Sequence, residues 1–246
     1  MIRLAVPVEG QTEEEFVNSL LADHLRSRQV APTPILLGRA RRPGVGGGNV
    51  SAPRLALEMA HLYHSFDVVT SLVDFYGFRH KGGRTVEELE THLGCAVRAR
   101  VGQGWHQAKV LPYVQKHEFE SLLFADVTAF TAIARVHEES INRLEYVRSR
   151  FHTPEEIDDG PETAPSKRIV GVLPSYRKSL HGPRVAKRMG IGAIRKECPR
   201  FDQWLRRLES IGNQFDLQRI ALARLSSTTF EPGCAKRHGG RRKHDD

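Results

Sequence analysis

Acidic side chains stand at or just after the ends of three apolar runs in this chain, and their positions suggest metal chemistry. These residues are Glu9, Asp74 and Glu118. Ligands of open α/β sheets bind outside the carboxyl ends of the strands, where the three side chains would meet if the strands are parallel and adjacent. Carboxylate oxygens suit Mg²⁺ or Mn²⁺, whose charge would offset the repulsion between them. Such an ion can polarise a phosphodiester and activate water, so we predict that the three carboxylates are catalytic and bind metal.

Neighbouring acidic residues have simpler explanations. Thr12 and Glu15 have the spacing of a capping box, and acidic residues in the first turn of a helix complement its dipole, which accounts for Glu14 and Glu15. Glu120 is expected to be a solvated residue. A role as a helix cap or turn residue also stays open for each of the three predicted ligands.

A second group of candidate residues is basic. Residues 158–169 form a loop with two prolines that leads into a helix, with Ser166, Lys167 and Arg168 near its start. Basic residues there oppose the helix dipole, so a helix N-terminus of this composition predicts a phosphate site. Arg39 lies in a glycine-rich loop that is either a phosphate-contacting loop or a plain surface connection. An ordinary surface loop stays open as the alternative for residues 158–169 too.

The elements that position these residues alternate between strand and helix. Four strands are predicted by apolar runs at residues 2–8, 34–37, 67–74 and 109–115. Helical spacing lies between them, and the helix of residues 87–101 starts behind the cap pair Thr85 and Glu88. This alternation predicts an α/β fold with a mostly parallel four-stranded sheet flanked by helices.

The domain organisation follows from the same patterns. With 246 residues, 39% of them hydrophobic, the chain can form one core of good size. We expect an α/β core over residues 1–126 and a helical extension packed on it over residues 127–230. Residues 231–246 form a basic tail of a composition typical of disordered segments.

Charge and composition narrow the classes of partner. The formal net charge is +8, which favours an anionic partner such as nucleic acid. The last twelve residues carry five Lys or Arg against two Asp, so about five of these positive charges belong to the rest of the chain.

Three widely spaced cysteines argue against a disulfide framework. No apolar run approaches the length that spans a membrane and no signal segment is evident, so we expect a cytoplasmic protein without a membrane partner.

Four motifs in one order resemble those of the bacterial family called domain of unknown function 4276. They are VEGQTE at residues 8–13, LVDFYG at 72–77, HEFESLLF at 117–124 and ETAPSKRI at 162–169. The resemblance covers most of residues 1–212. It implies a Toprim-like (Rossmann-like) fold, similar to the Toprim domains of topoisomerases, primases and overcoming-lysogenization-defect nucleases.

The resemblance also implies residue roles. Glu9 would be a general acid or base or a metal ligand, and Asp74 the first ligand of Mg²⁺ or Mn²⁺. Tyr76 stands where the Toprim pattern has a second Asp, so a second metal would need Glu118 or Glu120 as the replacement. Relatives of this kind often work beside an ATPase in defence against mobile DNA, which makes an ATPase partner protein a further expectation.

Two functions of different classes remain open from the sequence. The first is a metal-dependent Toprim-like nuclease or phosphotransfer enzyme that acts on nucleic acid. The second is a non-catalytic nucleic-acid-binding or adaptor protein on the same scaffold, which the tyrosine at position 76 favours. Nucleotide hydrolysis of the P-loop type has no support, because the chain has no G-x-x-x-x-G-K-[ST] motif.

Overall fold

The computed structural model describes residues 1–38, 50–157, 160 and 162–212. Arg39 and the predicted basic tail lie outside these residues. Within them, no helix is long and apolar enough to cross a membrane.

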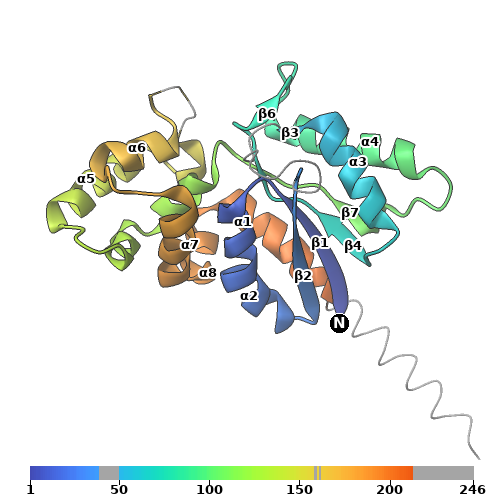
Figure 1. Cartoon of the computed structure of the whole chain (residues 1–246), viewed down its shortest axis with the longest axis horizontal. Helices are drawn as coiled ribbons and strands as arrows, with labels where there is room; N and C mark the ends of the chain where they lie inside the picture. The colour runs from blue at the N-terminus through green and yellow to red at the C-terminus, as the bar shows by residue number, and fades with distance from the viewer. Residues whose placement is uncertain (39–49, 158–159, 161, 213–246) are drawn as a thin grey trace, which may run out of the picture.

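A four-stranded parallel sheet forms the centre of the molecule (Figure 1), with the strand order β2-β1-β4-β7. Its strands are β1 (Ile2–Val8), β2 (Val30–Leu36), β4 (Val68–Thr70) and β7 (Val110–Leu111). The predicted α/β class and parallel sheet are therefore confirmed. The second strand begins at Val30 rather than at residue 34. It contains two prolines and tolerates them because β2 is an edge strand.

Two short parallel pairs continue the sheet beyond its carboxyl edge. They are β5 (Val73–Asp74) with β8 (Val114–Gln115), and β3 (Val50–Ser51) with β6 (Phe78–Arg79). The third and fourth predicted strands run side by side, and both are interrupted at the level of Pro112, which has no N–H to donate. The Ser71 hydroxyl fills the gap, since it donates to the Tyr113 carbonyl at 2.9 Å and accepts from the Tyr113 amide at 3.0 Å.

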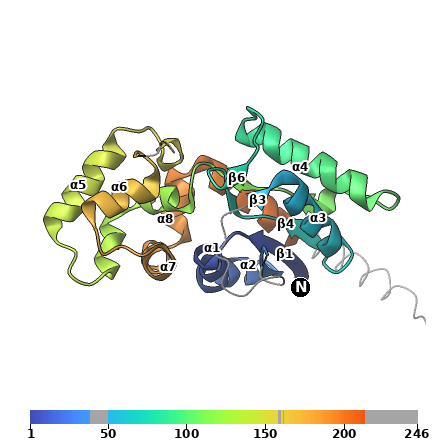
Figure 2. The ribbon, with the colours of Figure 1, turned by 45° about the horizontal axis from the view of Figure 1, so that its top comes forward.

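Helices cover both faces of the sheet (Figure 2). One face packs against α3 (Ala52–Tyr63) and α4 (Val86–Val101), through a cluster that includes Leu55, Met59, Leu89 and Leu93. The Thr85–Glu88 capping box predicted for α4 is present. The other face packs against α1 (Gln11–Phe16), a π-helical turn at Val17–Leu21, α2 (Ala22–Arg26) and a helix over residues 199–212.

The remaining described helices belong to the second half of the chain, as predicted. They are α5 (Glu138–Ser149), α6 (Pro165–Val172), α7 (Lys178–Met189) and α8 (Ile191–Glu197). Short 3-10 helices lie at Gln107–Lys109, Phe119–Ala125, Val127–Ala132 and Pro154–Glu156. Helix α7 lies beside α1, whereas α5 and α6 lie together farther from the sheet (Figure 1).

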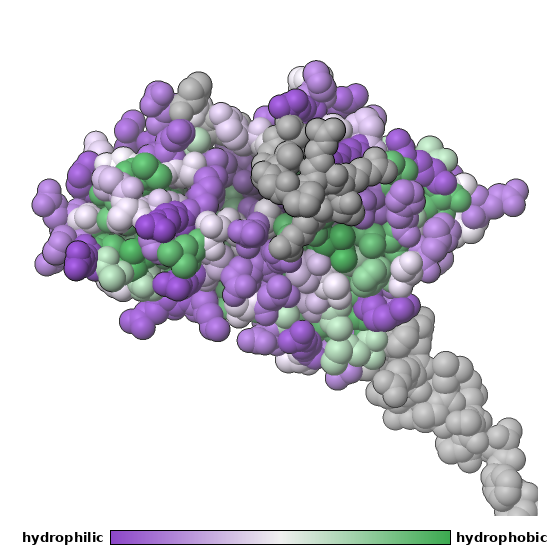
Figure 3. All heavy atoms as spheres, viewed as in Figure 1, coloured by the Kyte–Doolittle hydropathy of each residue, from purple (hydrophilic) through white to green (hydrophobic). Residues whose placement is uncertain are grey.

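The surface on the side shown in Figure 3 is mostly hydrophilic. Hydrophobic side chains gather there over α5 and α6 and again beside the sheet. Tyr146 of α5 is 67% exposed and lines a hollow of about 400 Å³ with Val147 and Val172.

The helix of residues 199–212 is fastened to the sheet by Trp204. The Trp204 ring stacks on Tyr113 with 4.4 Å between ring centroids, and its indole N–H donates to the Thr70 hydroxyl at 2.8 Å. The second half of the chain thus closes one face of the core that the first half builds.

Replacing Trp204 with Ala tests this attachment. The substitution removes a buried stacked ring and leaves the Thr70 hydroxyl without its donor, so we expect the free energy of unfolding to fall by about 3–5 kcal/mol. Urea unfolding followed by far-UV circular dichroism measures the change. The exposed Tyr146→Ala serves as control, with an expected change within about 0.5 kcal/mol. Equal stability of the two variants would contradict this packing.

Candidate functional site

The three predicted carboxylates meet at one cavity on the carboxyl side of the sheet. Glu9 follows β1, Asp74 ends β5, and Glu118 lies just beyond β8. The cavity has a volume of about 570 Å³ and is lined by Glu9, Asp74, Tyr76, Gly77, Phe78, Arg79, Glu118 and Lys178. The parallel sheet therefore brings together residues that lie more than one hundred positions apart in the sequence.

Glu9 is held against the backbone of Gly77. A Cβ atom at position 77 would lie 2.5 Å and 2.8 Å from the two Glu9 carboxylate oxygens, so any larger residue would push the Glu9 side chain out of its present position. Glu9 Oε2 is buried and has no hydrogen-bond partner among the described residues. Burial raises the pKa of Glu9, and the nearby Lys178 ammonium opposes part of that rise.

Asp74 is fixed by the start of the next element. Its Oδ1 accepts a hydrogen bond from the Phe119 amide at 2.8 Å, at the first residue of the 3-10 helix. The pKa of Asp74 is raised well above its usual range, first by burial and then by the carboxylates of Glu13, Glu120 and Glu9. The Lys178 ammonium lowers the pKa of Asp74, but it does not outweigh the burial and the three neighbouring carboxylates.

Lys178 supplies positive charge to the site; the sequence indicated only that it belongs to a basic stretch compatible with nucleic-acid backbone contacts, not that it pairs with the carboxylates. Its Nζ lies 3.1 Å from Glu118 Oε1 and 3.1 Å from Glu120 Oε2. These two carboxylates and Asp74 raise the pKa of Lys178, so the ammonium stays protonated. The signal was available, because Lys178 opens α7 and a basic residue in a first turn opposes the helix dipole. The same reasoning had singled out Lys167 and Arg168.

Glu120 was expected to be solvated, and that prediction is wrong. Its side chain is 1% exposed, pairs with Lys178 and accepts a hydrogen bond from the Tyr176 hydroxyl at 3.4 Å. Burial raises the pKa of Glu120 to about 7. Residues 119–125 form a 3-10 helix that packs its apolar side chains into the core, and Glu120 is carried inward with them.

Glu13 is a second buried carboxylate that the sequence did not single out. The predicted Thr12–Glu15 capping box is absent, because α1 begins at Gln11. Instead, Glu13 Oε2 accepts from the Gly10 amide at 2.9 Å. Burial and the charge of Glu9 raise the pKa of Glu13. The acidic side chain that caps α1 is therefore part of the site.

The predicted phosphate residues near the start of α6 have other partners. Ala164, not Ser166, is the cap residue, and the Ser166 amide donates to Glu118 Oε2 at 2.9 Å. Arg168 donates from Nε to the Thr163 carbonyl at 2.6 Å. Lys167 is exposed. The start of α6 is thus joined to the carboxylate cluster through Glu118, and phosphate binding by these residues stays a prediction.

The charges of the site are out of balance. Among the described residues, the Lys178 ammonium lies at the centre of five carboxylates, and Arg79 stands at the wall of the cavity; the five are Glu9, Glu13, Asp74, Glu118 and Glu120. We call these five residues the carboxylate cluster. Where its members are ionised, the cluster would repel an anionic phosphodiester unless a further cation entered. The oxygen donors and the unpartnered Glu9 Oε2 fit a hard divalent cation.

A metal ion would nevertheless require side-chain rearrangement. Across the part of the chain that the structure describes, no group of three or more His, Cys, Asp or Glu side chains is arranged to hold a metal ion. The cluster instead directs Glu118 and Glu120 toward Lys178 and Asp74 toward the Phe119 amide. The carboxylate oxygens are suitable ligands for such an ion, but the side chains would have to rotate to hold it.

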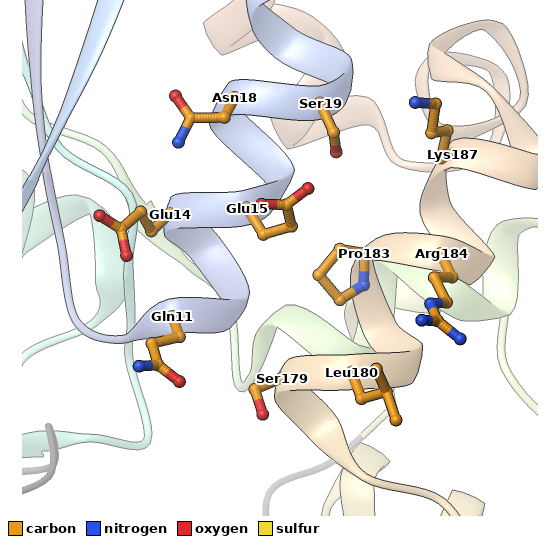
Figure 4. Close-up of a pocket in the computed structure, with 10 residues that line it drawn as sticks. All are labelled: Gln11, Glu14, Glu15, Asn18, Ser19, Ser179, Leu180, Pro183, Arg184 and Lys187. Carbon is orange, nitrogen blue, oxygen red and sulfur yellow. The ribbon is translucent and has the colours of Figure 1, made fainter.

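A second hollow lies between α1 and α7 (Figure 4). It has a volume of about 420 Å³, and Arg184 and Lys187 stand on its α7 wall while Glu14 and Glu15 stand on the helix that begins with α1. Two basic and two acidic side chains largely cancel each other's fields, so this hollow does not favour an anion over a neutral group.

The fold and the cluster define an α/β protein with a carboxylate-rich site at the carboxyl edge of a parallel sheet. The family model described as domain of unknown function (DUF4276) matches residues 8–209. The chain belongs to this family, which confirms the resemblance found in the sequence. No curated protein sequence matches the chain.

Solved structures similar to this chain include the C-terminal region of the OLD protein of Xanthomonas campestris pv. campestris. The iodine-phased structure has a TM-score of 0.44 and 14% identity, and the match covers 87% of this chain and 97% of that one. The platinum-phased structure has a TM-score of 0.43 and 14% identity, covering 89% and 97%. The mercury-phased structure has a TM-score of 0.40 and 12% identity, covering 87% and 97%.

The raised pKa of Glu120 predicts a pH dependence of stability. A carboxyl group with a pKa of about 7 in the folded protein and 4.5 when unfolded binds its proton more tightly when folded. Stability from this group is therefore full below pH 4.5 and is lost as the pH rises toward 7. We expect Glu120→Gln to lose less stability than wild type between pH 5 and pH 7.5, measured by urea midpoints.

The matched control for this measurement is Glu15→Gln, which changes an exposed glutamate. Its pH dependence should follow wild type. If Glu120→Gln also follows wild type over the same range, Glu120 is not the buried acid described above.

Proposed function

We propose that this protein is a divalent-metal-dependent enzyme that cleaves phosphodiesters of nucleic acid. The observation that carries the proposal is the carboxylate cluster, in which five acidic side chains surround Lys178 at the carboxyl edge of a parallel sheet. Burying so many carboxylates is costly, as the raised pKa values of Glu9, Glu13, Asp74 and Glu120 show. Buried carboxylates with raised pKa values are found most often at functional sites.

Glu9, Asp74 and Glu118 are the residues that would hold the metal. They line the open cavity, whereas Glu13 and Glu120 are buried and do not line it. A bound Mg²⁺ or Mn²⁺ would polarise the phosphodiester and lower the pKa of a water molecule. Glu9 would accept a proton from that water; the support is its place on the cavity wall and the lack of a hydrogen-bond partner for Oε2 within the described residues.

Lys178 would stabilise the negative charge that develops on the phosphate. Its ammonium reaches the cavity from the first turn of α7, and its partners keep it charged. If Glu118 turns from Lys178 toward a metal ion, the ammonium gains a free donor for a phosphate oxygen. Without a metal ion, Lys178 would offset the negative charge of the carboxylates. With a metal ion bound, Lys178 would contact the substrate.

The charge of the whole chain supports nucleic acid as the substrate class. The formal net charge is +8, and Arg79 is exposed at the cavity wall. Phosphate contacts of this kind are independent of sequence and weaken as salt rises. The Toprim-like relationship expected of the family agrees with this substrate class. An ATPase partner and a role in defence against mobile DNA stay predictions.

A non-catalytic nucleic-acid-binding or adaptor protein is the second candidate. The observation in its favour is that no three acidic side chains among the described residues are arranged around one metal position. Tyr76 also lines the cavity at the position where a second Asp was expected. This candidate predicts binding with a steep salt dependence and no cleavage with any divalent metal.

Replacing Asp74 with Asn separates the two candidates. Asn retains an oxygen that can accept from the Phe119 amide, so the fold should be preserved while the charge for the metal is lost. We expect Mg²⁺- or Mn²⁺-dependent cleavage of labelled single-stranded and duplex oligonucleotides to fall by about two orders of magnitude or more.

Asp67→Asn is the matched control for this variant. Asp67 precedes β4 at the opposite end of the sheet and pairs with Arg3 at the surface. Its substitution should leave cleavage unchanged. Undiminished cleavage by Asp74→Asn would remove Asp74 from the mechanism, and absence of cleavage by wild type with every metal would favour the adaptor.

A further inference from the structure

Tyr76 is an exposed aromatic side chain on the wall of the cluster cavity. It is 48% exposed and shares that wall with Glu9, Asp74 and Lys178. Tyr76 makes no hydrogen bond through its hydroxyl within the described part of the chain. Because the exposed ring lies on the wall of the cavity that holds the carboxylates, a ligand bound there could contact its face.

The backbone around Tyr76 is held in place. The Tyr76 amide donates to the His117 carbonyl at 2.9 Å, and the preceding Phe75 amide donates to the Gln115 carbonyl at 2.9 Å. Gly77 follows directly and packs against the Glu9 carboxylate. The Lys81 ammonium lies 5.8 Å from the Tyr76 ring centroid and 4.2 Å from that of Phe75. Tyr76 therefore belongs to a segment whose backbone is fixed beside the predicted metal ligand Glu9.

A nucleobase next to a bound phosphate matches this arrangement. Every base has a flat π-face that can stack on an aromatic ring whatever its sequence. Bases within a duplex already stack on their neighbours and cannot reach the tyrosine, so the feature selects unpaired nucleotides. Arg79 lies on the same wall, is exposed and makes no ion pair within the described residues, which leaves its guanidinium available to an adjacent phosphate.

We propose that Tyr76 stacks on an unpaired base next to the phosphodiester at the cluster, so that the site prefers single-stranded over duplex nucleic acid. This inference rests on the proposed function, because it takes the phosphodiester at the cluster as given. It deepens that function by naming the substrate class and a residue that determines it. It also gives a positive role to the side chain that replaces the expected second Asp.

Equilibrium binding with cleavage suppressed tests the inference. Fluorescence anisotropy is measured with Ca²⁺ in place of Mg²⁺, on labelled single-stranded DNA and RNA oligonucleotides and on the corresponding blunt duplexes. We expect Tyr76→Ala to weaken single-strand binding by about 5- to 150-fold, the range for loss of one stacked base. Duplex binding should be weaker in wild type and unchanged in the variant.

Two further variants make the result specific. Tyr76→Phe keeps the ring and removes the hydroxyl, so it should bind single strands within about twofold of wild type. Tyr146→Ala removes an exposed tyrosine of α5 that does not line the cavity, and should also bind as wild type. Far-UV circular dichroism confirms that each variant is folded before binding is measured.

The possible outcomes separate this inference from the proposed function. Equal losses in Tyr76→Phe and Tyr76→Ala would overturn stacking and assign a hydrogen bond from the hydroxyl. Unchanged single-strand binding by Tyr76→Ala would overturn the inference while leaving the proposed function intact. If wild type binds neither single strands nor duplexes, both are overturned.

Discussion

The ammonium of Lys178 is the interaction on which the site depends. It joins the first turn of α7 to Glu118 and Glu120, which lie beyond the last strand of the sheet. The other cluster residues, Glu9, Glu13 and Asp74, also lie within its field. Removing one partner from a buried charge cluster leaves the others uncompensated. The second half of the chain therefore supplies the positive charge that the carboxylates of the first half require.

The geometry of the sheet explains why acidic residues can gather at this edge. Parallel strands place their carboxyl ends side by side, and the Ser71 hydroxyl keeps the third and fourth strands joined across the break at Pro112. The two strands therefore stay paired up to Asp74 and Gln115, and Glu118 follows shortly after. Gly77 then leaves space for the Glu9 carboxylate, which a larger residue would fill.

An excess of buried negative charge links this arrangement to function. Where these carboxylates are ionised, five of them beside one ammonium repel a phosphodiester unless a further cation is present. The present arrangement directs the carboxylates toward Lys178 and backbone amides. Under the proposed function, metal binding would require side-chain rotation, and that rotation would free the Lys178 ammonium for the substrate.

The sequence predicted the strands and the three cavity carboxylates because both depend on local pattern. Apolar runs mark strands, and Glu9, Asp74 and Glu118 follow them directly. It did not predict Lys178 or the burial of Glu120, because these depend on how α7 packs beside the cluster, which is a long-range property. The cap of α1 was also placed wrongly, since Gly10 and Glu13 form it and neither gives a strong N-cap signal alone.

Isothermal titration of Mn²⁺ and Mg²⁺ into wild type and Asp74→Asn tests the central claim most directly. The account predicts saturable binding to wild type that is lost in the variant, because the cluster would hold the ion through Asp74 and its neighbours. Absence of binding to wild type, or binding that the substitution leaves unchanged, would contradict it.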